Sequence, residues 1–136
     1  MSRPVTTGAW LLRWDTVRGG EPEVIQPDEG TGRRAEVFEA ESGGFVVFDG
    51  YLFDRAVLGF APSGSDVSLV ASGYERWRDG LFDKLRGGFV AAIWDQEQRR
   101  LLVGRDAMGL MPCFYWWNER VVLVSPSLDE IGRAHV

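Results

Sequence analysis

The sequence predicts an α+β fold in which two mainly antiparallel sheets are flanked by helices. Short apolar runs separated by turn residues recur along the chain, as in β-hairpins, and one block with helical spacing interrupts them. Residues 89–94 are continuously apolar, which is typical of a strand buried on both faces. Such a strand needs packed layers on either side, so layered sheets with helices are favoured over a simple barrel or bundle.

The N-terminal part predicts one strand and then a hairpin. Residues 8–14 are apolar enough for a first strand, and the Gly-, Pro- and Glu-rich stretch to Arg34 predicts a loop or a weak strand. Residues 35–41 and 45–48 flank Ser42-Gly43-Gly44, which supplies turn residues, and the second strand runs into Asp49-Gly50, again with turn chemistry.

The middle of the chain predicts the main helix. Ser63-Gly64-Ser65-Asp66 offers N-cap residues. Apolar side chains then recur on one helical face at Val67, Val70, Ala71, Tyr74 and Trp77. A shorter helical turn is expected over residues 81–85, ending at Gly87-Gly88.

The C-terminal half predicts two hairpins and a closing helix. Residues 89–94 and 100–103 pair across a charged segment, residues 95–99, which we expect to form a solvated tip. Residues 114–117 and 121–124 form the second pair. Ser127-Leu128-Asp129-Glu130 has the spacing of a capping box, in which the glutamate side chain returns to the N-cap backbone.

Composition excludes several classes of protein. A chain of 136 residues that is 45% hydrophobic can form one compact domain without disulfides. The net charge of −5 and the scattered basic residues argue against nucleic acid as a partner. Cys113, expected to be a small buried hydrophobe, and His135 form no zinc-binding cluster, so we expect no metal and no cofactor. No segment resembles a signal peptide or a membrane span, which predicts no membrane partner and a cytoplasmic location.

An ordered series of motifs extends over residues 35–131. It comprises Asp49-Gly50, Asp54-Arg55, Ser65-Asp66, Tyr74-Glu75-Arg76-Trp77, Leu85-Arg86-Gly87-Gly88-Phe89, Trp94-Asp95, Gly104-Arg105-Asp106-Ala107-Met108-Gly109-Leu110-Met111-Pro112 and Ser125-Pro126-Ser127-Leu128-Asp129-Glu130-Ile131. In this order the motifs resemble the class II, N-terminal-nucleophile glutamine amidotransferase domain of asparagine-synthetase-like enzymes. The resemblance implies a shortened four-layer αββα sandwich of the Ntn-hydrolase type, formed as one domain over residues 1–136.

Two further motifs favour structural roles. Arg105-Asp106, followed by Gly109 and Pro112, predicts a charged pair that fixes a tight connection between strands. Ser42-Gly43-Gly44 is not followed by the Asp-Ser of a pyrophosphate-binding loop, so a hairpin turn is favoured over a nucleotide site. We therefore expect no ATP-pyrophosphatase synthetase domain in this chain.

The family's nucleophile is missing from the sequence. In the family, a cysteine at the mature N-terminus attacks glutamine and its own α-amine serves as the general base. Aligning Thr7-Gly8 with the family's Cys-Gly start puts Thr7 at that position, with six residues before it that leave its amine acylated. An amide nitrogen cannot act as the base.

The other parts of the family's site are altered as well. The oxyanion hole uses an asparagine and the glycine after it, and here the pair is Asp49-Gly50. A carboxylate roughly 4 Å from an oxyanion would add about 4 kcal/mol of repulsion at an effective dielectric near 20. Of the groups that hold the substrate, Asp66 matches but could equally be a helix cap, Tyr51 replaces a glutamate, and Arg33 or Arg34 is the candidate arginine.

Together these changes favour a non-catalytic domain that serves as a structural or docking partner of an ATP-dependent amide-forming synthetase, separate or fused. Similar degenerate domains occur in lasso-peptide cyclases and β-lactam synthetases of specialised metabolism. Trp116 and Trp117 are candidates for the interface, and a homo-oligomer is a further expectation. Two alternatives stay open: an Ntn hydrolase or glutaminase activated by cleavage that exposes Thr7, and a module that binds a small amino-acid-like ligand.

Overall fold

The computed structural model describes residues 5–59 and 64–135. Its contacts gather in two compact units, and each unit is described by itself. Unit 1 comprises Met1–Ala35 and Pro112–Val136, and unit 2 comprises Glu36–Met111. The single-domain organisation stays a prediction.

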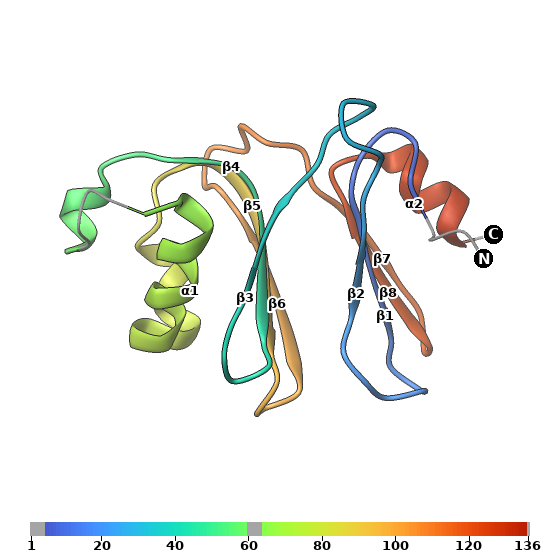
Figure 1. The fold of residues 1–136 in the computed structure, drawn as a ribbon, viewed down its shortest axis with the longest axis horizontal. Helices are drawn as coiled ribbons and strands as arrows, with labels where there is room; N and C mark the ends of the chain where they lie inside the picture. Colours follow the sequence, from blue (N-terminus) through green and yellow to red (C-terminus); the bar gives the residue numbers. More distant parts are fainter. Residues whose placement is uncertain (1–4, 60–63, 136) are drawn as a thin grey trace. The chain divides into compact units, whose positions relative to one another are not determined.

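Unit 1 contains a four-stranded antiparallel sheet with the strand order β2-β1-β8-β7 (Figure 1). Its strands are β1 (Leu11–Asp15), β2 (Glu23–Ile25), β7 (Phe114–Trp117) and β8 (Val121–Ser125). The short β2 lies in the Gly-, Pro- and Glu-rich stretch, where the sequence predicts a loop or a weak strand.

One helix, α2 (Leu128–His135), packs on this sheet. Ile131 of α2 is buried with Leu11 of β1 and Leu123 of β8, and Trp116 and Ile25 pack around them. Sequestering these side chains from water holds α2 against the sheet.

Unit 2 contains the second four-stranded antiparallel sheet, in the order β3-β4-β5-β6. Its strands are β3 (Glu36–Glu39), β4 (Phe45–Leu52), β5 (Gly87–Asp95) and β6 (Arg100–Arg105). All residues of β5 after Gly87 are buried, as its continuous apolar run predicts.

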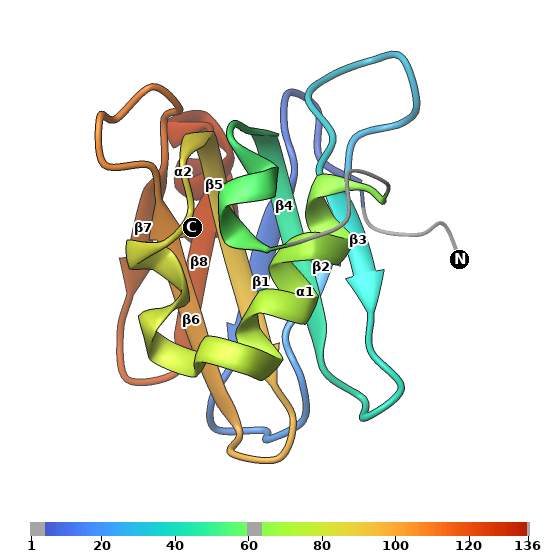
Figure 2. The ribbon, with the colours of Figure 1, turned by 90° about the vertical axis from the view of Figure 1, so that its left-hand side faces the viewer.

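The helical block of unit 2 lies between β4 and β5 in the chain. It consists of the short 3-10 helix η1 (Arg55–Leu58), the helix α1 (Asp66–Trp77) and a second 3-10 helix, η2 (Arg78–Asp83). Figure 2 shows α1 lying across the face of the sheet that β4 and β5 form. The predicted helix therefore forms, whereas the helical turn predicted over residues 81–85 begins three residues earlier.

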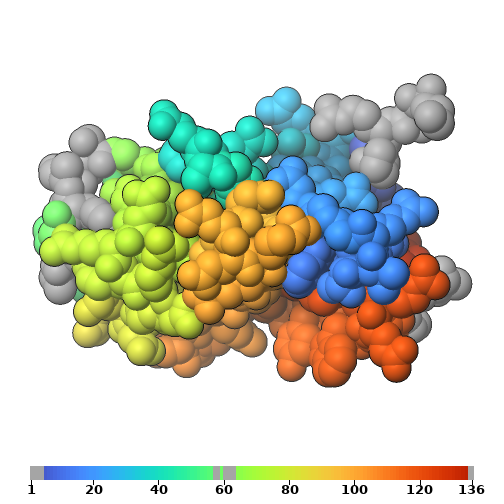
Figure 3. Space-filling view, turned by 90° about the horizontal axis from the view of Figure 1, so that it is seen from below, coloured from blue at the N-terminus to red at the C-terminus, as the bar shows by residue number. Residues whose placement is uncertain are grey.

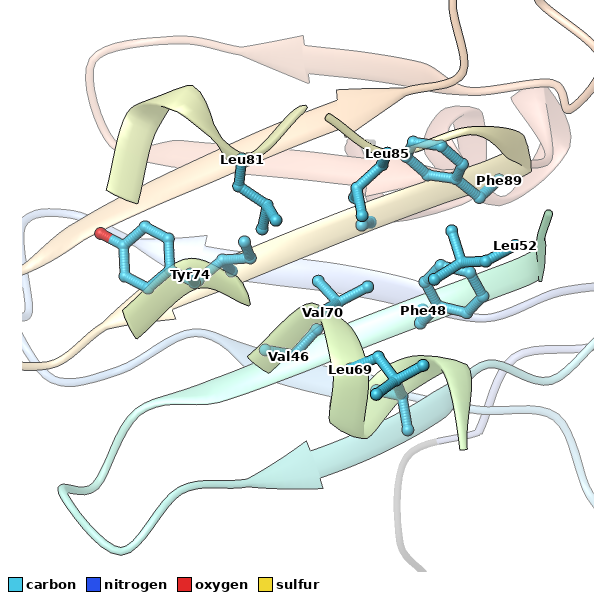
Figure 4. Packing of buried hydrophobic residues seen from close by; sticks show 12 residues of the cluster. Val46, Phe48, Leu52, Leu69, Val70, Tyr74, Leu81, Leu85 and Phe89 are labelled. Atoms are coloured by element: carbon cyan, nitrogen blue, oxygen red, sulfur yellow. The ribbon is translucent and has the colours of Figure 1, made fainter. Parts of the chain in front are cut away.

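The core of unit 2 lies between α1 and the sheet (Figure 4). Val70 of α1 lies beside Val46 and Phe48 of β4, and Tyr74 lies at the end of the cluster away from Phe89 of β5. The rings of Phe48 and Phe89 stack with centroids 5.9 Å apart. Leu81 and Leu85 close the cluster from η2 and the segment after it. The predicted α+β fold, with two antiparallel sheets flanked by helices, is confirmed.

Candidate functional site

Thr7 stands where the resemblance places the nucleophile, and α2 holds it. The backbone N–H and the Oγ1 hydroxyl of Thr7 both donate to Glu130 Oε1 at 3.2 Å, and the N–H of Gly8 donates to the same oxygen at 2.9 Å. Arg133 Nη1 donates to Thr7 Oγ1 and lies 3.3 Å from Glu130 Oε1. One carboxylate oxygen thus ties the segment before β1 to α2.

Glu130 is a residue that sequence reasoning missed. Its side chain is only 5% exposed and faces a segment 123 positions away in the chain, a distance that no local pattern reports. The capping-box prediction is wrong here, because the N–H of Ser127 donates to Ser125 Oγ at 3.1 Å and Glu130 is committed to Thr7 and Gly8.

These contacts oppose the chemistry of an N-terminal nucleophile. The Thr7 nitrogen is a peptide nitrogen whose lone pair is delocalised into the carbonyl, so it cannot act as a base, and its N–H donates to Glu130. Cleavage after Thr6 would create an amine 3.2 Å from Glu130 Oε1. A carboxylate at that distance raises the pKa of an amine and keeps it protonated, which removes its power as a base.

The segment with the candidate arginines runs beside the Thr7–Gly8 segment in unit 1. The N–H of Arg33 donates to the Gly8 carbonyl at 3.0 Å, and the N–H of Trp10 donates to the Arg33 carbonyl at 2.9 Å. Arg34 is exposed, and its Nη1 donates to the Pro27 carbonyl. The structure therefore places Arg33 and Arg34 beside Thr7 and Gly8 in unit 1. The Arg34 guanidinium donates a hydrogen bond to a backbone carbonyl.

In unit 2, β4 passes straight through Asp49 and Gly50. Gly50 pairs with Phe89 of β5 instead of turning the chain, so the turn chemistry expected at this pair is not used. The φ angle of Gly50 is 133°, and a Cβ there would lie 2.0 Å from the Gly88 carbonyl oxygen. Only glycine permits two strands to approach so closely at this point.

Asp49 is 6% exposed on β4, opposite Val90 of β5. The resemblance puts a neutral asparagine here, whose amide would donate to an oxyanion. A carboxylate can only accept hydrogen bonds when ionised, so Asp49 cannot supply that donor in its charged form.

Tyr51 takes the place of the family's glutamate and presents no carboxylate. Its side chain is 46% exposed, and its ring lies against Phe53, with the centroids 5.2 Å apart and the planes tilted by 57°. The ring also covers Gly88, where an added Cβ would come within 3.0 Å of the phenol oxygen. Tyr51 therefore packs over a glycine instead of offering an anion to a substrate amine.

Asp66 begins α1, but Ser65 is the N-cap, since Ser65 Oγ accepts from the N–H of Ser68 at 3.3 Å. Asp66 Oδ2 accepts from the N–H of Leu52 at 3.1 Å, and Oδ1 lies 3.6 Å from Arg55 Nε. The carboxylate thus links the end of β4 to α1 and pairs with a guanidinium. A substrate ammonium would have to compete with both partners.

Asp106 organises the connection after β6 through backbone groups. Its carboxylate is buried and accepts the N–H groups of Phe89 at 3.1 Å, Leu110 at 2.7 Å and Met111 at 3.3 Å. Burial is the largest influence on the pKa of Asp106 and would raise it, but these N–H donors together hold the pKa below its ordinary value. Gly109 allows the turn with a φ of 67°.

The neighbours of Asp106 in the motif lie at the surface. Arg105 is exposed at the end of β6. Pro112, the residue with which the second segment of unit 1 begins, is also exposed. The Asp106 carboxylate, rather than an Arg105–Asp106 ion pair, makes the hydrogen bonds that close this connection.

Asp95 is also buried, so the prediction of a solvated tip is wrong at this residue. Its carboxylate accepts from Tyr74 Oη at 2.6 Å and from the N–H of Gln98 at 3.0 Å, and Arg78 Nη1 lies 3.5 Å away. Burial alone would raise the pKa of Asp95, but the Tyr74 and Gln98 donors and the Arg78 charge hold it below its ordinary value. Figure 3 shows the α1–η2 region (yellow-green) beside the start of β6 (orange), where Arg100 also donates to Tyr74 Oη.

The two tryptophans of β7 differ in environment. Trp116 is half-buried and packs against the cluster of Leu11, Leu123 and Ile131 in unit 1, and its role at an interface stays a prediction. Trp117 is 67% exposed and Tyr115 is 71% exposed, and alternation along the strand puts both on the other face.

The described residues contain neither a candidate metal cluster nor a helix that could cross a membrane. Over residues 5–59 and 64–135, no group of three or more His, Cys, Asp or Glu side chains could hold a metal ion. In the same part of the chain, no helix is long and apolar enough to cross a membrane. Cys113 is half-buried rather than fully buried.

Comparison with known proteins identifies the family. A family model described as a glutamine amidotransferase domain matches residues 40–132. A putative glutamine-hydrolysing asparagine synthetase of Mycobacterium tuberculosis is 30% identical over 100 residues, which are 74% of this chain and 15% of that protein. Asparagine synthetase 1 of Bacillus subtilis is 25% identical over 130 residues, covering 79% of this chain and 21% of the synthetase. The amidase chry2 of Gibberella zeae is 29% identical over 99 residues, or 67% of this chain and 15% of the amidase.

The fold matches that of a solved amidotransferase. Glutamine phosphoribosylpyrophosphate amidotransferase of Bacillus subtilis superposes with a TM-score of 0.54 and 14% identity, over 90% of this chain and 36% of the other. This similarity supports the Ntn-hydrolase-like fold predicted from the motifs. The chain belongs to the glutamine amidotransferase domain family and is related to the asparagine synthetases that hydrolyse glutamine.

Proposed function

We propose that this domain does not hydrolyse glutamine and instead serves as the structural or docking partner of an ATP-dependent, asparagine-synthetase-like, amide-forming enzyme. The observation that supports this most directly is at Thr7, whose N–H and hydroxyl both donate to the buried carboxylate of Glu130. The nucleophile and the base of the family's reaction are therefore both absent in the form that the reaction requires.

The substrate side of the site supports the same proposal. A buried Asp49 stands in place of the oxyanion asparagine, and Tyr51 stands in place of a glutamate. Losing one oxyanion donor costs on the order of a hundred- to a thousand-fold in rate, and a negative charge at that place would add repulsion. Asp66, the remaining match, is engaged by the N–H of Leu52 and by Arg55.

The relatives suggest the nature of the partner. The aligned segments cover only 15% of the mycobacterial asparagine synthetase and 21% of the first one from Bacillus subtilis. We propose that the synthetase served by this domain is either a separate chain or a further part of the same protein. Its reaction would use an amine of the substrate instead of ammonia, as in the specialised-metabolite enzymes with similar degenerate domains.

The exposed face of β7 is the docking surface that we propose. Tyr115 and Trp117 present two large aromatic side chains at the edge strand of the unit 1 sheet. Aromatic residues are enriched at protein interfaces because a rigid apolar ring buries much area at little cost in conformational entropy.

The hydrolase alternative has a decisive test. Purified protein would be assayed for ammonia release from glutamine, and its intact mass would be measured on the same sample, with a Bacillus subtilis asparagine synthetase as the positive control for the assay. We expect no release above the protein-free blank and no species beginning at Thr7. Glutamine-dependent ammonia release by a species that begins at Thr7 would overturn the proposal.

The docking proposal is tested with matched variants of β7. Affinity purification from the native organism should recover an ATP-dependent synthetase with the unaltered protein and at least tenfold less of it with the double variant Tyr115→Ser, Trp117→Ser. A double variant at exposed positions of unit 2, Phe53→Ser with Val103→Ser, is the control and should recover the normal amount. Failure to find such a synthetase, either as a recovered chain or as a covalently attached part of the native protein, would contradict the docking role.

The ligand-binding alternative is distinguished by calorimetry with glutamine, glutamate and asparagine. Because Asp66 already holds Leu52 and Arg55, we expect no saturable heat with any of the three at millimolar concentration. A saturable signal that Asp66→Asn abolishes would favour a binding module over a docking partner.

A further inference from the structure

Unit 2 contains a groove whose lining includes neither Thr7 nor Asp49 nor Asp66. It has a volume of about 1020 Å³ and lies between the C-terminal half of α1, the β3–β4 hairpin and the β5–β6 turn. Phe38 and Phe45 contribute apolar surface from the hairpin, Ala71 from α1, and Ile93 and Trp94 from β5. This volume is at the upper end of pockets that hold single small molecules, which favours a larger, elongated occupant.

The rim of the groove is strongly acidic. Glu39 and Glu41 come from the hairpin, Glu75 from α1 and Glu97 from the β5–β6 turn. None of these four carboxylates makes a hydrogen bond or an ion pair with another residue of the described part of the chain. Four unpaired anions around one groove repel one another, so a cationic occupant would gain energy from all of them.

The groove's own cation is already committed. Arg78 lines the groove, but its Nη1 lies 3.5 Å from Asp95 Oδ2, and its guanidinium lies 5.3 Å from the centroid of the Tyr74 ring. Arg78 therefore balances the buried Asp95 and leaves the four rim carboxylates without a compensating charge.

A free strand edge borders the groove. β3 is the first strand in the order β3-β4-β5-β6, so its ladder hydrogen bonds are made with β4 on one side alone. All four residues of β3 are exposed, including Val37 at 39% and Phe38 at 37%. An exposed edge strand with apolar side chains is a template on which an extended peptide can add as a further strand.

We propose that this groove binds an extended, basic peptide segment of a partner protein, which adds to the edge of β3 and places Lys or Arg side chains among Glu39, Glu41, Glu75 and Glu97. Main-chain hydrogen bonds to β3 would set the direction of the segment, and its apolar side chains at the alternate positions would lie on the other face of the added strand. A strand rises about 3.3 Å per residue, so alternate residues on one face are about 7 Å apart and cations at every second position face the rim. This inference does not depend on the proposed role of β7.

Binding is measured with a defined probe, an acetylated and amidated peptide of sequence Gly-Lys-Val-Arg-Val-Lys-Gly, by titration calorimetry at low salt. We expect saturable one-to-one binding that weakens as ionic strength rises, because exposed ion pairs are screened. The same peptide with Glu at the three basic positions should not bind. A peptide N-methylated at alternate residues, which keeps its charge but loses donors of the strand ladder, should bind at least tenfold more weakly.

Two variants of the protein separate the groove from general acidity. The first replaces the rim: Glu39→Gln, Glu41→Gln, Glu75→Gln and Glu97→Gln. The second replaces four exposed acids of unit 1 as a matched control: Glu21→Gln, Asp28→Asn, Glu29→Gln and Glu119→Gln. We expect the rim variant to bind at least tenfold more weakly and the control variant to bind within twofold of the unaltered protein.

A further variant blocks the groove without changing charge. Ser72 is exposed on α1 and lines the groove, so Ser72→Trp should fill it and weaken binding at least tenfold while the circular dichroism spectrum is retained. Absence of binding by the unaltered protein, equal weakening in the rim and control variants, or unchanged affinity for the N-methylated peptide would each overturn the proposal. Equal binding of a polyamine such as spermine would show a simple cation site and would also overturn strand addition.

Discussion

At the level of single residues, Glu130 and Asp106 have the same task in different units. Each is a buried carboxylate that accepts two backbone N–H groups from a segment without regular structure, Glu130 from Thr7 and Gly8 and Asp106 from Leu110 and Met111. Backbone donors in such segments have no ladder partner, so a side-chain acceptor is needed to bury them without a large penalty. These two residues therefore fix loops that the secondary structure alone would leave free.

Replacing Glu130 tests this role in unit 1. We expect Glu130→Ala to lower the free energy of unfolding by about 2 kcal/mol, because three donors lose one buried, charged acceptor. Asp129→Ala, an exposed neighbour on the same helix, should change stability by less than about 0.5 kcal/mol. Urea unfolding followed by tryptophan fluorescence measures both, and equal effects of the two variants would show that Glu130 is not an anchor.

At the level of elements, the close pairing of β4 with β5 depends on glycine. A Cβ added at Gly50 would lie 2.0 Å from the Gly88 carbonyl oxygen, and the φ angle of Gly50 is 133°. We expect Gly50→Ala to destabilise unit 2 by at least about 3 kcal/mol or to prevent folding, since both the backbone angle and the space exclude a side chain.

Gly132 provides the matched control for that substitution. It lies in α2, where an added Cβ would meet nothing within 4 Å. Gly132→Ala should therefore raise the free energy of unfolding by about 0.5–1 kcal/mol, because alanine is the better helix former. Thermal unfolding of the two variants decides the comparison, and a Gly50→Ala protein as stable as the parent would refute the close approach.

The β7 strand separates two roles on its two faces. Trp116→Ala should destabilise unit 1 by about 2–3 kcal/mol, because a half-buried ring in the cluster with Leu123 and Ile131 leaves a cavity. Trp117→Ala removes a ring that is 67% exposed and should cost less than about 1 kcal/mol. Chemical denaturation of both variants checks the order, and a larger loss for Trp117 would reverse the assignment of the faces.

For the whole molecule, two of the three buried aspartates of unit 2, Asp95 and Asp106, predict how stability depends on pH. The pKa of Asp95 and the pKa of Asp106 are both lowered in the folded state. A lowered pKa means that the stabilisation is complete above the ordinary carboxyl pKa of about 4. It is lost as the pH falls through the pKa of the folded state. The free energy of unfolding should therefore be level from about pH 5 to 7 and decrease below about pH 4.

The variant Asp106→Asn checks the source of that decrease. It should be less stable than the parent at pH 7, because an amide faces three backbone N–H donors. Its stability should change less between about pH 5 and pH 2, since one of the two titrating groups is gone. Urea unfolding across this range measures both, and an unchanged acid dependence would assign the effect to other carboxylates.

Most of the helices and strands, and the family, can be predicted from the amino-acid sequence. Hydrophobic spacing gave α1 and its buried face, the apolar runs gave β5 and the hairpins, and the ordered motifs pointed to the amidotransferase domain that residues 40–132 match. These features are local in the chain or are fixed by residue identity, so no knowledge of the folded molecule is needed to detect them.

Contacts between residues that are far apart in the chain are visible in the tertiary structure and not in the sequence. The sequence predicts a capping box that includes Glu130, but Glu130 contacts Thr7 and Gly8 instead. It predicts a solvated Asp95, but Asp95 lies beside Tyr74 and Gln98. Trp116 joined the core, and β4 continued through Gly50 because β5 lies against it. Each of these contacts depends on residues that are distant in the sequence. Local sequence patterns indicate propensity and spacing, but they do not identify the distant groups that satisfy a buried donor or fill a cavity.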